Sequence, residues 1–358
     1  MKRSLQIGGA FVGLIVGAGF ASGQEIMQYF TSFGIWGTVG GVLATLFFMF
    51  LGYTLAQLGT DLQTASHKGV IYYLGGRYIG FIFDVLITFF LFGVAVVMFA
   101  GAGSTFEQMF GISPMIGSII MVVATILTLL LNVQNIINLI ALVTPYLMVI
   151  IFAILLYSIF TMDISLAEAD ALAKEQASGA SSWLVGALLY VSYNIAAGAA
   201  LLIVMGGTLK DRKVAGMGGI FGGIMLGALI ILIHIAMLVK IDVVAGIAMP
   251  TLELANQIHP AVGVLMAIAL LGMMYNTAVG MFYSFTVRFI KPENKSFKPA
   301  VVVTGLLGFG ASLVGFTTLV GKVYSTMGYL GFALIIAIVI AWARKDKRQK
   351  VAVAAKTI

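Results

Sequence analysis

The chain has no cysteine and very little charge, and both absences narrow what it can be. Without cysteine it has no disulfide framework, no thiol nucleophile and no thiolate metal site. Its three histidines, His67, His234 and His259, are too far apart to form a metal-binding pair on one helix. Charged residues make up 9% of the chain, against about 25% in soluble domains. Charge this sparse cannot cover a water-facing surface, so the solvent is mostly lipid.

Motifs for nucleotide-driven or catalytic chemistry are also missing from the sequence. There is no GxxxxGK[ST] loop, which excludes ATP-driven transport within this chain. There is no HExxH or GxSxG motif, and the ionisable residues within apolar runs are scattered. We therefore expect neither an enzyme nor a bound cofactor.

Long apolar runs dominate what is present, since 61% of the residues are hydrophobic. A helix needs about 20 apolar residues to cross the hydrocarbon core, and barrel strands are far shorter and alternate with a period of two. The runs fit the helical case and predict an all-α membrane protein. Its ten expected transmembrane helices are residues 5–31, 35–58, 78–103, 113–131, 136–160, 182–206, 215–239, 261–288, 299–317 and 322–342.

Positive charge is concentrated on one side of these spans. With both termini inside, all but three of the 20 Lys and Arg residues are cytoplasmic, and only Lys174, Lys240 and Lys322 lie outside. This bias sets membrane orientation, and it accounts for the net charge of +7 without a nucleic-acid partner. We expect a multi-pass protein of the bacterial inner membrane with cytoplasmic termini. Besides a small-molecule substrate, the expected partner is the lipid bilayer, and the sequence leaves the oligomeric state open.

The acidic external loop 161–181 divides the chain into two halves of five spans. The first half is 1–160, and the second is 182–358, which ends in a basic tail. A repeat with an odd number of spans must be inverted. Each half opens with a span interrupted by small residues, at 16–24 and at 190–200. Paired interruptions of this kind are the best sequence pointer to a transporter binding site, so helices 1 and 6 are predicted to be broken.

An unwound helix frees backbone groups that lipid cannot satisfy but a substrate or ion can. A half-helix N-terminus suits a carboxylate, and a C-terminus offers carbonyls to a cation. Close helix packing is the alternative explanation for small residues. The polar residues that follow Gly17-Ala18-Gly19 favour a site there. Near Asn194 the two explanations stay equally open, because an asparagine also serves as a hydrogen-bonding link between helices.

The run Gly17-Ala18-Gly19-Phe20-Ala21-Ser22-Gly23-Gln24-Glu25 resembles the first-helix signature of the YkvI family of bacterial membrane proteins. That family is similar to the amino acid–polyamine–organocation superfamily, which has the LeuT fold. The resemblance extends over nearly the whole chain in span count, loop charges and five-plus-five plan. It implies that helices 1 and 6 enclose the substrate, with a substrate carboxylate on the amides of Ala18 and Gly19. The expected substrate-binding residues are Gly17, Ala18, Gly19, Ser22, Gly23, Glu25, Tyr193, Asn194 and Gly198.

The resemblance also implies a sodium ion between the helix 1 break and helix 8. The matching ligands are the carbonyls of Gly13, Val16 and Met273 and the side chains of Asn276 and Thr277. Sodium-coupled relatives usually have two hydroxyl residues at the last two positions. Asn276 departs from that pattern, although an amide oxygen is a competent ligand for a hard cation. Helix 5 lacks the lysine that some proton-coupled relatives place at this position, which favours a cation.

Two further features complete the expected site. The segment 248–256 resembles the short helix that caps the outer vestibule in this fold, and Pro250 suits its first turn. Glu25 and Asp84 are acidic residues within spans and are therefore functional candidates. Glu25 could bind a substrate amine, gate the vestibule, carry a proton or only pair locally. Asp84 could be an inner gate or proton site, or simply the partner of Arg77.

Together these observations predict a secondary active transporter of a small amino acid or related zwitterion. It would work by alternating access as a symporter, with sodium favoured over protons as the coupling ion. Two alternatives remain: a proton-coupled carrier, and a ligand sensor of the spore germinant receptor type that does not transport.

Overall fold

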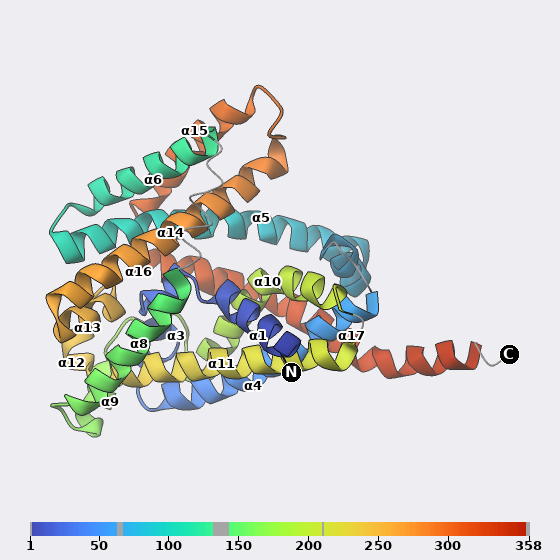
Figure 1. The fold of residues 1–358 in the computed structure, drawn as a ribbon, viewed down its shortest axis with the longest axis horizontal. Helices are drawn as coiled ribbons and strands as arrows, with labels where there is room; N and C mark the ends of the chain where they lie inside the picture. Colours follow the sequence, from blue (N-terminus) through green and yellow to red (C-terminus); the bar gives the residue numbers. More distant parts are fainter. Residues whose placement is uncertain (1, 63–66, 132–142, 210, 356–358) are drawn as a thin grey trace.

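The computed structural model describes residues 2–62, 67–131, 143–209 and 211–355, and all regular secondary structure in these ranges is helical (Figure 1). The elements are α1 (Lys2–Ile15), α2 (Ala18–Ala21), α3 (Gln24–Tyr29), η1 (Thr31–Phe33), α4 (Trp36–Leu62), α5 (His67–Phe110), α6 (Pro114–Leu131), α8 (Val143–Phe160), α9 (Leu166–Lys174), α10 (Trp183–Gly207), α11 (Arg212–Val239), α12 (Ile241–Val244), α13 (Pro250–Ile258), α14 (Pro260–Phe289), α15 (Phe297–Ser312), α16 (Phe316–Leu319), η2 (Val320–Tyr324) and α17 (Ser325–Ala355).

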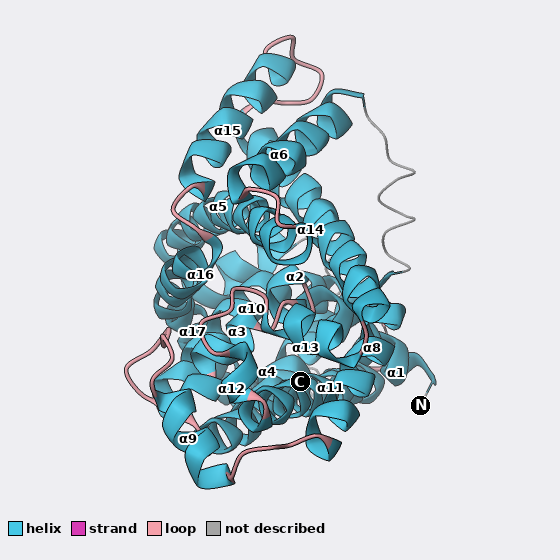
Figure 2. Ribbon diagram, turned by 90° about the vertical axis from the view of Figure 1, so that its left-hand side faces the viewer, coloured by secondary structure: helices cyan, strands magenta, loops and turns pink. Residues whose placement is uncertain are grey.

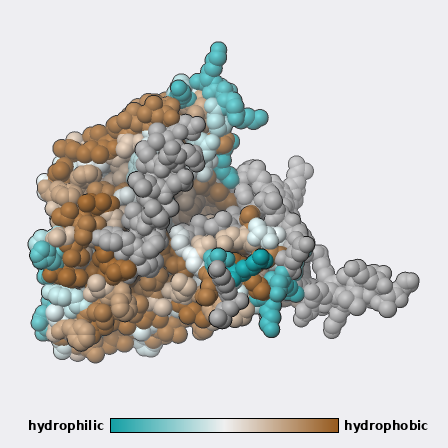
Figure 3. Space-filling model, viewed as in Figure 1, coloured by the Kyte–Doolittle hydropathy of each residue, from teal (hydrophilic) through white to brown (hydrophobic). Residues whose placement is uncertain are grey.

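Six stretches of the described chain are helical, long and apolar enough to cross a membrane. They lie in α4, α5, α6, α11, α14 and the run from α16 into α17, and shorter apolar helices lie in α8, α10 and α15. The outward-facing surface is apolar in the view of Figure 3, with hydrophilic residues gathered at its edges. The side chain of Phe160, for example, is 83% exposed, which lipid tolerates and water would not. This is a multi-pass membrane protein, and the count of ten spans stays a prediction.

The long helices form two packed groups, one of α1, α4, α10 and α11 and the other of α5, α6, α14 and α15. Seen along the bundle, α2 and α3 lie between these groups (Figure 2). Glycines let the helices of the first group approach closely. A Cβ at Gly219 would collide with the backbone of Gly52, and one at Gly223 with the backbone of Met49. Small residues at helix interfaces are the usual means of close packing in lipid.

The first span is interrupted twice. The amide of Val16 makes the last α-helical bond of α1, to the carbonyl of Val12, and the amide of Gly17 then turns to the carbonyl of Ile15. Gly17 itself is extended, and four residues of α2 follow. The second interruption is at Gly23, whose φ of 80° lies in the left-handed region that favours glycine. The glycines therefore end the helical segments, which is the role that the sequence suggested for this cluster.

The break predicted for helix 6 is wrong, because α10 runs without interruption through the small residues around Asn194. Most of those residues are alanine, the strongest helix former, and none is proline. The side chain of Asn194 bonds the carbonyl of Tyr190 on its own helix, and the hydroxyl of Ser192 donates to the carbonyl of Gly328 on α17. The small residues of α10 serve packing and helix formation. The interruption predicted at 190–200 therefore frees no backbone groups.

Candidate functional site

A cavity of about 510 Å³ lies at the first interruption of helix 1, between the two helix groups. Its walls come from α1, α2, α3 and α10 on one side and from α5 and α14 on the other, with η2 also contributing. Cavities of this size hold small-molecule ligands. Many of the residues proposed from sequence lie on its walls: Gly13, Val16, Gly17, Ala18, Gly19, Glu25, Tyr193, Asn194, Met273, Asn276 and Thr277.

The remaining predicted residues lie elsewhere. The hydroxyl of Ser22 donates to the carbonyl of Gly19 at 2.7 Å, which stabilises the turn after α2. Gly23 forms the left-handed turn into α3, and Gly198 is buried within α10. Asp84 is in α5, but its side chain lies outside the described part of the structure.

Glu25 is the charged group of this cavity. The short helix α3 places its side chain in the interior, where it is 6% exposed. The hydroxyl of Tyr193 donates to Glu25 Oε2 at 2.6 Å. The ring of Tyr193 stacks on that of Tyr324, with centroids 5.0 Å apart and an interplanar angle of 20°. Residues from α3, α10 and η2, which belong to the predicted first, sixth and tenth spans, thus meet around one carboxyl group.

The five predicted sodium ligands line the same cavity at its α1 and α14 walls. Because the amide of Gly17 bonds Ile15, the carbonyl of Gly13 loses the donor that a continuous helix would give it. Asn276 and Thr277 are adjacent residues of α14. Carbonyl, amide and hydroxyl oxygens are the ligands that hard cations prefer. The donor set therefore suits a monovalent cation, and the described residues contain no group of three His, Cys, Asp or Glu that could hold a metal ion.

Sequence reasoning missed Tyr324, which lines the cavity at the end of the π-helical turn η2. Such turns are rare and occur often at functional sites. Tyr324 belongs to the predicted last span, but no motif marks it, and its place opposite Tyr193 depends on how two distant helices pack. Met98 of α5 and Met281 and Ser284 of α14 also line the cavity without a sequence signal.

The helix α13 packs against the turn between α2 and α3. The hydroxyl of Thr251 donates to the carbonyl of Ala21, and its amide donates to the carbonyl of Ser22 at 3.1 Å. Nearby, the side chain of Gln108 makes two hydrogen bonds of 3.0 Å with the backbone of Met249. The helix expected over 248–256 is therefore present, begins at Pro250 and bonds the backbone next to the second interruption of the first span.

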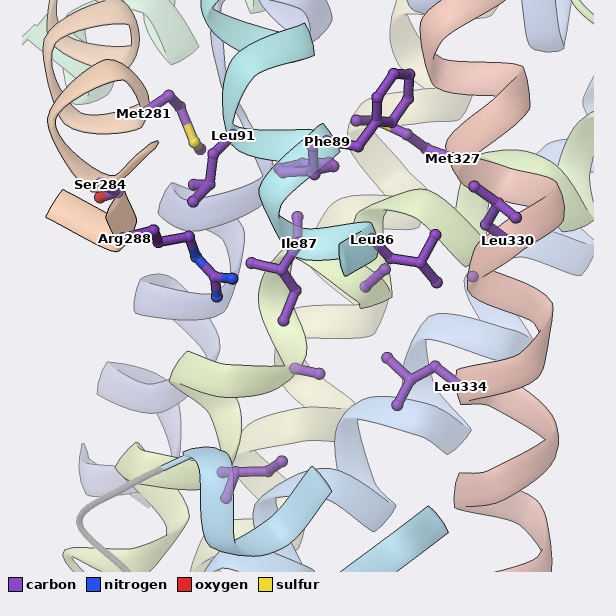
Figure 4. Close-up of a pocket in the computed structure, with 16 residues that line it drawn as sticks. Leu86, Ile87, Phe89, Leu91, Met281, Ser284, Arg288, Met327, Leu330 and Leu334 are labelled. Carbon is purple, nitrogen blue, oxygen red and sulfur yellow. The ribbon is translucent and has the colours of Figure 1, made fainter. Parts of the chain in front are cut away.

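A second cavity of about 320 Å³ continues toward the opposite end (Figure 4). The two cavities share Phe90, Leu91, Ala197, Met281 and Ser284. Figure 4 shows apolar side chains of α5 and α17 around the second cavity, with Arg288 of α14 on its wall. The guanidinium of Arg288 donates to the hydroxyl of Thr88 at 2.8 Å. The central cavity thus adjoins a second, largely apolar cavity toward the other end of the bundle.

No protein-family model matches the chain. It is 25% identical to the uncharacterized membrane protein YkvI of Bacillus subtilis, over 93% of this chain and 94% of that protein. It is 24% identical to the uncharacterized protein YyaD of the same organism, over 92% and 94% of the two chains. The chain is homologous to YkvI, which confirms the resemblance carried by the first span.

Solved structures show the fold. The crystal structure of MhsT in complex with L-phenylalanine matches with a TM-score of 0.61 at 16% identity, over 94% of this chain and 88% of that one. A manganese transporter of Eremococcus coleocola matches with a TM-score of 0.57 at 17% identity, over 94% and 77% of the two chains. The chain thus has the all-helical fold of LeuT-like membrane transporters, and these neighbours are not enzymes.

Proposed function

We propose that this homologue of YkvI is a secondary active transporter of a small amino acid or related zwitterion, coupled to sodium. One observation carries the proposal: residues from helices 1, 6 and 8 that the sequence singled out for substrate and ion line a single cavity at the helix 1 break. Small residues that served only close helix packing would leave no such cavity. The protein would act in the bacterial inner membrane with both termini cytoplasmic.

The asymmetry of the cavity supports alternating access. At the end expected to face outward, α13 holds the backbone between α2 and α3, whereas the central cavity shares residues with the second cavity toward the end expected to face the cytoplasm. A carrier must exchange this arrangement for its opposite. The two helix groups that wall the cavity are each well packed internally, so they can move relative to one another while the site stays between them.

Sodium is the coupling ion of this proposal because of the donor set beside the break. The proposed ligands are the backbone carbonyls of Gly13, Val16 and Met273 and the side-chain oxygens of Asn276 and Thr277, none of which carries a formal charge, and all five residues line the cavity. Such a set suits Na⁺ better than a proton. Proton coupling would instead need a titrating group, and Glu25 is the acidic residue among the described lining residues.

A transition-metal cargo is not proposed, although one structural neighbour is a manganese transporter. That likeness concerns the fold. Manganese sites usually gather carboxylates or imidazoles, and the described lining of this cavity contains a single carboxylate and no histidine.

Counterflow in proteoliposomes tests the proposal against the sensor alternative. Vesicles loaded with an unlabelled amino acid should accumulate the same labelled amino acid, and an inward sodium gradient should drive net uptake. Vesicles without protein and vesicles with a collapsed sodium gradient are the controls. Binding of amino acids without any counterflow would refute the transporter and favour a sensor. Uptake driven by a pH gradient but indifferent to sodium would replace sodium with protons.

A further inference from the structure

Glu25 places an acidic group on the wall of the central cavity, and no cationic side chain of the described lining compensates its charge. No lysine, arginine or histidine is among the described residues that line this cavity. The hydrogen-bond partner of its carboxyl is the hydroxyl of Tyr193, which is neutral. Burying a carboxylate carries a large desolvation cost unless a cation or a proton compensates it. The site is therefore built to receive one positive charge at Glu25.

The carboxyl of Glu25 also occupies a particular place, against the backbone of Gly19. A Cβ added at Gly19 would collide with Glu25 Oε1 and would lie 3.3 Å from the hydroxyl oxygen of Tyr324. The family resemblance puts a substrate carboxylate close by, on the amides of Ala18 and Gly19. Two carboxylates in that space would repel each other. The position of Glu25 thus argues against the implied pose and reverses the charge expected of the substrate there.

The aromatic surroundings suit a cation as well. The stacked rings of Tyr193 and Tyr324 both line the cavity beside Glu25, and Phe90 lines it from α5. The faces of aromatic rings attract ammonium groups when water is excluded. Asn194 of α10 adds a neutral polar group to the same cavity.

We infer that the central cavity recognises the cationic amine of its substrate at Glu25, and that a substrate carboxylate is not required for binding. The substrate class is small organic amines, including amino acids held through their amino group. This inference rests on the proposed function only in taking the central cavity as the substrate site. A sodium ion or a proton on Glu25 would satisfy the same charge, and the experiment below separates these cases.

The test measures binding of matched compounds to the purified full-length protein by thermal shift and by calorimetry. Each set holds an amino acid, the same molecule without its carboxylate and the same molecule without its amine. Suitable sets are glycine, methylamine and acetate; leucine, 3-methylbutylamine and 4-methylpentanoate; and phenylalanine, phenethylamine and 3-phenylpropionate. In at least one set, the amine should bind within about tenfold of the amino acid, and the acid should bind at least about 100-fold more weakly.

Two variants assign the effect to Glu25. Glu25→Gln keeps the shape and an acceptor for Tyr193 but removes the charge, so amine-bearing compounds should bind about 10- to 100-fold more weakly. Glu253→Gln removes a carboxylate from α13, outside the cavity, and should leave their affinity unchanged. An unchanged melting temperature of both variants without ligand shows that the fold is intact.

The outcomes distinguish this inference from the transport proposal. Acids that bind as well as their amino acids, no binding by any amine, or full amine affinity in Glu25→Gln would each overturn amine recognition. Full amine affinity in that variant, together with a lost dependence on sodium or on pH, would assign Glu25 to the ion or the proton instead. Amine binding that behaves as expected without any counterflow would overturn transport and leave amine recognition standing.

Discussion

The first span and the span that corresponds to it in the second half are similar in composition and different in conformation. Both carry clusters of glycine, alanine and serine in the middle of an apolar run. The first span ends its helix at Val16 and turns again at Gly23, whereas α10 continues through Asn194. Small residues permit an interruption but do not require one. The cavity thus lies beside the interrupted backbone of the first span and against a continuous stretch of α10 that includes Tyr193.

The largest expected effect is at Gly19, in the interrupted first span. Gly19→Leu would drive a side chain into the Glu25 carboxyl and should abolish substrate binding, a loss of more than about 100-fold measured by calorimetry. Gly9→Leu is the matched control, because a Cβ at Gly9 meets no atom within 4 Å. Wild-type affinity in Gly19→Leu would refute the assignment of the cavity.

Sodium binding should also depend on the interrupted first span and on α14. If sodium stabilises the protein, saturation at about 100 times its dissociation constant adds roughly 2.7 kcal/mol. Asn276→Ala and Thr277→Ala should each remove most of the sodium-dependent rise in melting temperature. Thr286→Ala on the same helix should keep it, because that hydroxyl bonds the carbonyl of Phe282 and does not line the cavity. An equal rise in all three variants would remove the ion site.

A pair of substitutions tests the difference between the two spans directly. Gly23→Ala places a side chain in a left-handed conformation and 2.8 Å from Thr251, so it should cost roughly 1–2 kcal/mol or more of stability. Ala196→Gly lies inside the continuous helix α10 and should cost about 1 kcal/mol through lost helix propensity. Apparent melting temperatures in one detergent measure both. A neutral Ala196→Gly would indicate that α10 unwinds at this point.

The smallest expected effect concerns the contact of α13 with the backbone between α2 and α3. Thr251→Val removes the hydroxyl that bonds the carbonyl of Ala21, a loss of about 1 kcal/mol, and should expose the interior about fivefold more often. The chain has no cysteine, so labelling of a Met237→Cys variant reports this opening, since Met237 is buried beside Gly23. Thr304→Val on α15 is the control. Equal labelling rates would show that Thr251 does not hold α13 closed.

Much of the site followed from local chemistry in the sequence. The cluster at Gly17 and Gly19 was a candidate because small residues followed by polar ones suit a broken helix, whereas Asn276 and Thr277 were candidates only through the family resemblance. Their meeting in one cavity agrees with that reading. Tyr324 could not be found in this way, because its place beside Tyr193 depends on how α10 packs against the last span.

By itself, the sequence determined the membrane environment, the helical class and the turn at Gly23, because lipid demands long apolar helices and the left-handed backbone of that turn favours glycine. The tertiary structure decided two things that composition could not. It kept α10 continuous, since its polar side chains bond within the helix and to α17. It also placed the Glu25 carboxyl of α3 beside Gly19, close to where the resemblance puts a substrate carboxylate.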